Sequence, residues 1–136
     1  KITHFIAAAG TGGTISGTGR YLKEQNPDIQ VVAVDSINSF RSTNGNPKPY
    51  TIDGMGVDFD SEVLDKSVID EFIPVADEPS LAILKKIANS YGILAGLSSG
   101  SVAHAAQMYC KNLGHEALVV MIFGDSGRAY LSKNVF

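Results

Sequence analysis

The chain is poor in cysteine, has no large excess of one charge and contains no long hydrophobic run. Cys110 is the single cysteine among 136 residues, so no internal disulfide can form, and we expect a reducing, cytoplasmic setting. Acidic and basic residues are mixed and sum to a net charge of -3, so no basic stripe indicates nucleic acid as a partner. No apolar run approaches the roughly 18 residues of a membrane-spanning helix. The histidines have no metal-ligand spacing with one another or with the cysteine, so no metal site is predicted: His4, His104 and His115.

The start of the chain is unusual for a whole protein. Neither an initiator methionine nor a leader is present, and the chain enters an apolar, strand-like stretch at residues 2–9 almost at once. A chain that begins inside a core element is typical of a piece cut from a longer protein. We therefore expect residues 1–136 to be a fragment of a larger domain.

Apolar, β-branched runs alternate with segments of helical spacing. The runs at residues 2–9, 29–34, 71–75 and 117–123 predict strands. Helical spacing predicts helices at residues 14–25, 79–91 and 101–112, with Asp77 capping the second and Gly92 ending it. Ser, Asn, Gly and Pro crowd the stretch after residue 36, which predicts a long loop to about residue 61. This order predicts an α/β fold, with a largely parallel sheet covered by helices on both faces.

A glycine-rich turn joins the first predicted strand to the first predicted helix. Free backbone N–H groups at a helix N-terminus favour an anion, and the glycines let it approach closely. Two threonine hydroxyls can add donors, so the natural ligand is a phosphate. The glycine turn, as we call it below, consists of Gly10, Thr11, Gly12, Gly13 and Thr14.

Three interpretations of the glycine turn compete. A Walker A loop is rejected, because it needs a lysine that this turn lacks. A dinucleotide fingerprint matches poorly, because Ile15 stands at the position of its third glycine. Asp35, however, ends the next strand, where a ribose-binding acid would stand, so a nicotinamide-dinucleotide module stays open. The turn taken alone is also compatible with a tight turn that binds nothing.

Small polar residues follow two other apolar runs, a short one at residues 93–95 and the predicted strand at residues 117–123. They are Ser98-Ser99-Gly100 and Gly124-Asp125-Ser126-Gly127. Either serine, or Asp125, could simply cap a helix. Ligands of open α/β sheets, however, lie beyond the carboxyl ends of the strands. Together with the glycine turn, these segments would surround a small, flat ligand that carries a phosphate.

Four motifs in order resemble a known family over nearly the whole chain. The sequence is similar to the cysteine synthase and cystathionine β-synthase family, the fold-type II pyridoxal-phosphate enzymes, and the resemblance implies part of that family's large domain. The first motif is the glycine turn. The others are Asp53-Gly54-Met55-Gly56, Gly96-Leu97-Ser98-Ser99-Gly100 and Asp125-Ser126-Gly127.

The resemblance implies a role for each motif. The glycine turn would hold the phosphate of pyridoxal 5'-phosphate (PLP), and Ser98 would hydrogen-bond the pyridine nitrogen. Gly54, Met55 and Gly56 would lie on the substrate side of the site. Asp125 would support the pyridine end. A neutral hydroxyl beside the ring nitrogen suits elimination and replacement at the β-carbon better than transamination.

The resemblance also implies a reaction, with two branches. Gly56-Val57-Asp58-Phe59 and the Arg and Tyr of residues 125–130 favour cystathionine β-synthase, in which serine and homocysteine give cystathionine. Residues 96–100 look more like cysteine synthase, in which O-acetylserine and sulfide give cysteine. The family resemblance implies a homodimer for the full-length protein.

One departure from the family is important. The family's Schiff-base lysine and its Thr/Ser-Gly-Asn substrate loop lie in an N-terminal half that has no counterpart here. The lysines of this chain stand in segments predicted to be at the surface. We therefore expect the full-length parent to be an enzyme and the 136-residue chain alone to be inactive. A non-catalytic interaction fragment remains a third interpretation.

Overall fold

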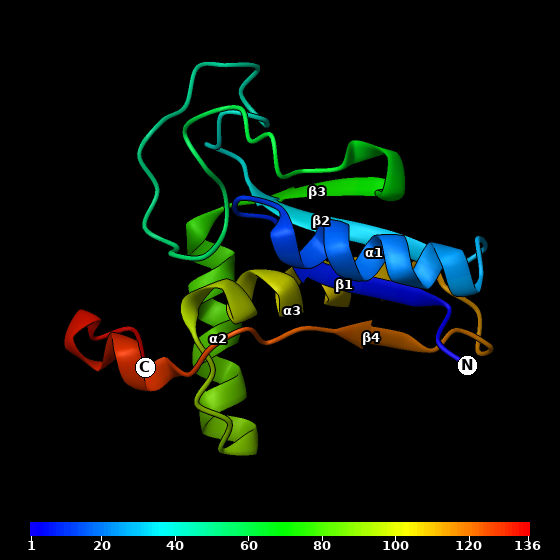
Figure 1. Ribbon diagram of the computed structural model, residues 1–136. Helices are drawn as coiled ribbons and strands as arrows, with labels where there is room; N and C mark the ends of the chain where they lie inside the picture. The colour runs from blue at the N-terminus through cyan, green and yellow to red at the C-terminus, as the bar shows by residue number, and fades with distance from the viewer.

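A sheet of parallel strands forms the centre of the computed structural model, which describes residues 1–136 (Figure 1). Its four strands are β1 (His4–Ala8), β2 (Gln30–Ser36), β3 (Glu71–Val75) and β4 (Val119–Met121), in the order β3-β2-β1-β4. All three strand pairs are parallel. The two central strands are almost wholly buried, as expected for strands that are covered on both faces. The carboxyl ends of all four strands therefore meet at one edge of the sheet.

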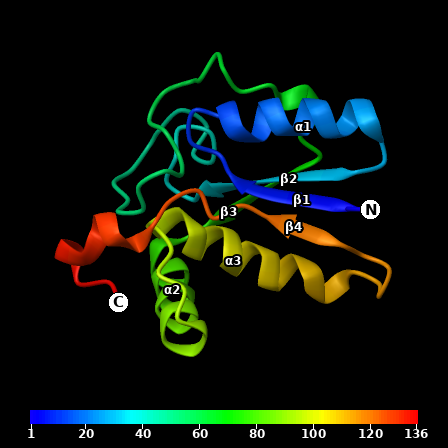
Figure 2. The same cartoon turned by 60° about the horizontal axis from the view of Figure 1, so that its bottom comes forward.

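Three helices cover the two faces of the sheet. Helix α1 (Gly13–Gln25) lies on one face, and α2 (Asp77–Tyr91) and α3 (Leu97–Tyr109) lie on the other (Figure 2). Short 3-10 turns complete the chain at Lys66–Val68, Cys110–Asn112 and Gly127–Lys133. The predicted α/β fold with a parallel sheet between helices is confirmed. No helix is both long and apolar enough to cross a membrane.

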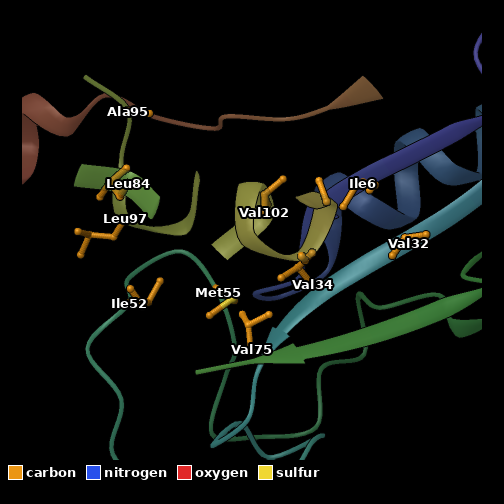
Figure 3. Packing of buried hydrophobic residues seen from close by; sticks show 12 residues of the cluster. Ile6, Val32, Val34, Ile52, Met55, Val75, Leu84, Ala95, Leu97 and Val102 are labelled. Carbon is orange, nitrogen blue, oxygen red and sulfur yellow. The ribbon is translucent and has the colours of Figure 1, made fainter. Parts of the chain in front are cut away.

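The hydrophobic core is divided by the sheet into two clusters. The α1 side contains a cluster of seven buried residues that includes Phe5, Ile15 and Val31. The side of α2 and α3 holds twelve, among them Ile6, Leu84 and Val102 (Figure 3). Each large buried aliphatic side chain contributes about 1.5–3 kcal/mol to folding. These clusters fix α1 and α3 against the strands whose ends form the site.

The loop between β2 and the first 3-10 turn spans residues 37–65 and contains no helix or strand, as predicted. It is nonetheless anchored to the core, because Ile52 and Met55 are each only 1% exposed. Met55 lies among the side chains of the larger cluster (Figure 3). The loop therefore has a fixed path across the carboxyl ends of the strands.

Three predicted boundaries were wrong. Helix α3 begins at Leu97, not at residue 101, because Gly96 is the extended residue that precedes it. Strand β4 covers only Val119–Met121 of the predicted 117–123. Asp77 is the first residue of α2 and not its cap. Its carboxylate instead accepts hydrogen bonds from the N–H and hydroxyl of Thr51, at 2.6 and 2.8 Å. Gly92 does end α2, in the left-handed region at φ 67°.

Candidate functional site

A cavity of about 350 Å³ opens at the carboxyl end of β1. The glycine turn forms one side of it, and the turn at residues 53–56 contributes another. Most of the lining is therefore backbone rather than side chain, which lets a ligand approach the peptide groups closely. The lining residues are Ala8, Gly10, Thr11, Gly12, Gly13, Thr14, Gly54, Gly56 and Val57.

The backbone N–H groups of the glycine turn have no acceptor within the chain. Residues 10–12 lie outside any helix or strand and donate to no other backbone group. Gly13 and Thr14 are the first two residues of α1, where no intrahelical acceptor exists. Five residues that line the cavity thus carry N–H donors without acceptors at the positive end of a helix, which is the arrangement that binds phosphate.

Gly12 gives the glycine turn its shape. Its φ of 97° lies in the left-handed region, which favours glycine. A Cβ at this position would lie 2.5 Å from Cδ1 of Leu64 and 2.9 Å from the Leu64 Cα. The carbonyl oxygen of the preceding residue, Thr11, accepts a 2.6 Å hydrogen bond from the Ser61 hydroxyl. The C-terminal part of the long loop thus stabilises the glycine turn. The sequence pattern does not indicate this contact.

The turn at residues 53–56 lies against the glycine turn. Gly54 and Gly56 both have positive φ, 84° and 73°. The N–H of Gly56 donates to the carbonyl oxygen of Ala9 at 2.9 Å, and a Cβ on Gly10 would lie 3.5 Å from the Gly54 oxygen. Both glycines line the cavity, whereas the Met55 side chain is buried in the core. Met55 therefore contributes only backbone to this side of the site.

Ser98 lies beside Gly54, which lines the cavity. A Cβ built on Gly54 would lie 3.2 Å from the Ser98 hydroxyl oxygen. Ser98 and Ser99 both stand inside the first turn of α3, so neither is a cap. Ser98 is 8% exposed. The neighbouring Ser99 is fully buried, and its hydroxyl has no hydrogen-bond partner.

Asp35 is not free to bind a ribose. It is 1% exposed, and its carboxylate accepts hydrogen bonds from Ser39 Oγ at 2.7 Å and from Arg41 Nε at 3.0 Å. The Ser36 N–H and the Ser42 hydroxyl donate to it as well. These partners occupy the carboxylate within the protein, which removes the main support for a dinucleotide site. No group of three or more His, Cys, Asp or Glu side chains could hold a metal ion.

Comparison with known proteins agrees with a phosphate-binding role for this cavity. The family described as pyridoxal-phosphate dependent enzymes matches residues 1–125. The chain belongs to this family. The dinucleotide interpretation is therefore wrong.

Relatives of known activity come from both branches of the predicted reaction. Cystathionine β-synthase of Saccharomyces cerevisiae is 41% identical over 96% of this chain and 27% of its own length. Cysteine synthase of Staphylococcus aureus is 36% identical over 99% of this chain and 44% of its own length. The crystal structure of the O-acetylserine dependent cystathionine β-synthase of Helicobacter pylori superposes with a TM-score of 0.88 and 38% identity, over 99% of this chain and 44% of that one. The chain thus spans less than half the length of each of these relatives.

No lysine lines the cavity of this PLP-family chain. The two lysines that form ion pairs do so away from the cavity: Lys23 pairs with Asp70, and Lys133 with Asp53. The lining therefore offers hydrogen-bond donors for a phosphate and backbone that a ligand can approach closely. It offers no amine that could hold the cofactor's aldehyde.

Asp125 does not line the cavity. Its backbone oxygen accepts from the N–H of Gly96 at 2.8 Å, and its carboxylate fills the space that a Cβ on Gly96 would need. The Tyr130 hydroxyl donates to that carboxylate at 2.5 Å. Asp125 therefore contacts the residue that precedes α3, two positions before Ser98. The helix-cap interpretation of Asp125 was wrong, because Ser126 caps the following 3-10 turn.

The Tyr130–Asp125 contact predicts an abnormal alkaline titration. The hydrogen bond to Asp125, with burial and the carboxylate charge, raises the pKa of Tyr130 from 10.0 to about 12. Because the folded protein holds this proton more tightly, the stabilisation is complete below pH 10 and is lost as the pH rises through about 12. Phenolate absorbance in stopped-flow pH jumps should show one tyrosine ionising near pH 12, and Asp125→Asn should bring that step back towards 10. A step that stays near 12 in Asp125→Asn would contradict the assignment, and Tyr130→Phe serves as the control that removes the step.

Proposed function

We propose that the protein containing this chain catalyses PLP-dependent β-replacement, joining serine and homocysteine to give cystathionine. The observation that carries the proposal is the cavity at the end of β1, with five N–H donors that lack acceptors. This donor set fits a phosphate ester at a helix N-terminus. Membership of the PLP family supports PLP as the molecule that carries the phosphate.

In this proposal different residues of the site bind different parts of PLP. The glycine turn holds the phosphate, and the Ser98 hydroxyl, beside Gly54, bonds the ring nitrogen. When bound, PLP supplies the electron sink that allows a substrate to lose its α-proton and its β-substituent. A serine hydroxyl can donate to that nitrogen without giving up its proton, which suits β-replacement. Asp125 supports this end of the site through Gly96, and Gly54 and Gly56 let the amino-acid substrate approach the backbone.

We also propose that residues 1–136 form only the phosphate and ring side of the catalytic domain. The lysine that holds PLP would come from another part of a longer, homodimeric protein. The absence of any lysine from the cavity lining supports this, as does the coverage of only 27% and 44% of the two curated relatives. The 136-residue chain by itself should show no turnover, and robust turnover by the purified chain would refute the division.

Cysteine synthase is the second candidate for the activity. Residues 96–100 resemble that branch, and the Staphylococcus aureus relative is a cysteine synthase. The two candidates differ in leaving group and nucleophile. The Helicobacter pylori relative, whose name combines O-acetylserine with cystathionine synthesis, indicates that the two choices must be tested separately.

The test crosses two donors with two nucleophiles. The full-length protein, loaded with PLP, is supplied with serine or O-acetylserine and with homocysteine or sulfide, and products are identified by mass spectrometry. The proposal expects the highest kcat/KM for serine with homocysteine. Cysteine formed best from O-acetylserine and sulfide would establish the second candidate instead. The same protein stripped of PLP is the control, and activity should return when PLP is restored.

A further inference from the structure

Arg41 connects a buried carboxylate to the peptide that begins the glycine turn. Its Nε donates to Asp35 Oδ2 at 3.0 Å, and its Nη2 donates to the carbonyl oxygen of Ala9 at 3.1 Å. Both side chains are well buried, with 15% of Arg41 and 2% of Asp35 exposed. The guanidinium also lies 5.5 Å from the ring centre of Phe72. These contacts hold the long loop at a defined place beside the end of β1.

The Ala9 carbonyl is a shared acceptor for two segments. Besides Arg41 Nη2, it accepts the N–H of Gly56 at 2.9 Å. The loop that carries Arg41 and the turn that carries Gly54 and Gly56 are thus joined at one oxygen atom, and both glycines line the cavity. Movement of this oxygen would disturb both sides of the cavity together.

The peptide group between Ala9 and Gly10 transmits this contact to the glycine turn. No peptide bond in the chain is cis, so the C=O of Ala9 and the N–H of Gly10 point in opposite directions within one plane. The two donors to the Ala9 oxygen therefore set the direction of the Gly10 N–H. That N–H has no acceptor in the chain, and Gly10 lines the cavity.

The shape of the guanidinium matters more than its charge. Arginine presents several donors in a rigid planar fork, whereas lysine concentrates its donors on one flexible nitrogen. A lysine at position 41 can neutralise Asp35, but it does not reproduce two donors aimed at acceptors on separate segments. Charge and geometry can therefore be separated by substitution.

We propose that Arg41, held by Asp35, is a positioning residue that orients the Ala9–Gly10 peptide so that the glycine turn receives a phosphate. The inference rests on the proposed function, because the phosphate is taken to be that of PLP. Arg41 itself does not line the cavity, so it acts through the backbone and not by contact with the ligand.

The test uses two variants of the full-length protein. Arg41→Lys keeps a positive charge beside Asp35 but loses the fork. The double variant Asp35→Asn, Arg41→Met removes both charges and so leaves no unpaired buried ion. PLP affinity is measured by titrating the apoprotein, and the bound phosphate is observed by 31P NMR. Both variants should bind PLP about tenfold more weakly, the effect of one charge-assisted hydrogen bond, and should shift or broaden the 31P signal.

The controls separate positioning from stability and from the proposed function. Arg20→Met removes an arginine of an exposed pair, with Asp65 at 2.7 Å, and should leave PLP affinity and the 31P signal unchanged. If Arg41→Lys is folded and both measurements match those of wild type, the inference is overturned even if its thermal stability has changed. Because Arg41→Lys retains the charge, it carries the test if the double variant does not fold. Failure of the wild type to bind PLP would instead overturn the proposed function.

Discussion

Replacing Gly12 by alanine is expected to abolish PLP binding and to lower the free energy of unfolding by about 2–5 kcal/mol, the combined cost of left-handed strain and overpacking. The φ of 97° is unfavourable for alanine. The added methyl group would also lie 2.8 Å from Leu64 Cβ and 2.9 Å from Leu64 Cα. A rotamer change of Leu64 cannot move these two atoms, so the backbone must shift. That shift displaces the N–H groups that form the proposed phosphate site.

Gly17, inside α1, offers a matched control substitution. Gly17 is in the middle of the helix, exposed, and a Cβ there meets nothing within 4 Å. Gly17→Ala should therefore raise the free energy of unfolding by up to about 1 kcal/mol, the difference in helix propensity, and leave PLP binding intact. Urea unfolding and PLP titration of both variants give the comparison. Equal stability and equal PLP affinity in the two variants would contradict the proposed role of Gly12.

Much of the fold was predictable because hydrophobic periodicity and glycine placement are local signals. The buried runs of β1 and β2 predicted parallel strands, and the turn between β1 and α1 predicted an anion site. The start of α3 is harder to predict, because serines close to a glycine are typical helix-capping residues. In the structure Gly96 is extended, and the helix already includes the small residues that follow Leu97. Capping propensity was thus overridden by packing against α2.

The parts of the site that could not be predicted depend on contacts distant in sequence. Arg41 lies in an irregular loop, and 32 residues separate it from Ala9. The hydrogen bond from Ser61 to Thr11 spans 50 residues. Neither residue belongs to a periodic pattern, so nothing in the sequence indicates its partner. For the same reason the sequence alone is compatible with Asp35 as a ribose ligand, although a hydroxyl and a guanidinium from the following loop occupy its carboxylate.

Replacing Gly100 by alanine is expected to be the second most damaging change, lowering the free energy of unfolding by about 2–3 kcal/mol through overpacking. Gly100 stands in the first turn of α3, where that helix crosses α2. An added Cβ would overlap the backbone oxygen of Ser80 and would lie 2.9 Å from Leu84 Cβ. The Ser101 hydroxyl donates to Ser80 Oγ at 3.0 Å next to this contact, so the two helices cannot separate without breaking a buried hydrogen bond.

The same clash should affect the proposed PLP-ring side of the site and leave the phosphate side largely intact. Ser98 is two residues before Gly100, and its hydroxyl faces Gly54. Moving the first turn of α3 should therefore alter the absorbance of bound PLP in the full-length protein, while the 31P signal of its phosphate stays near that of wild type. Gly12→Ala, in contrast, should remove the 31P signal of bound phosphate, because that variant no longer binds PLP. Gly114→Ala, where a Cβ meets nothing within 4 Å, is the control and should change stability by no more than about 0.5 kcal/mol. If Gly100→Ala altered the phosphate signal and left the ring absorbance unchanged, α3 would not be the element that positions the ring.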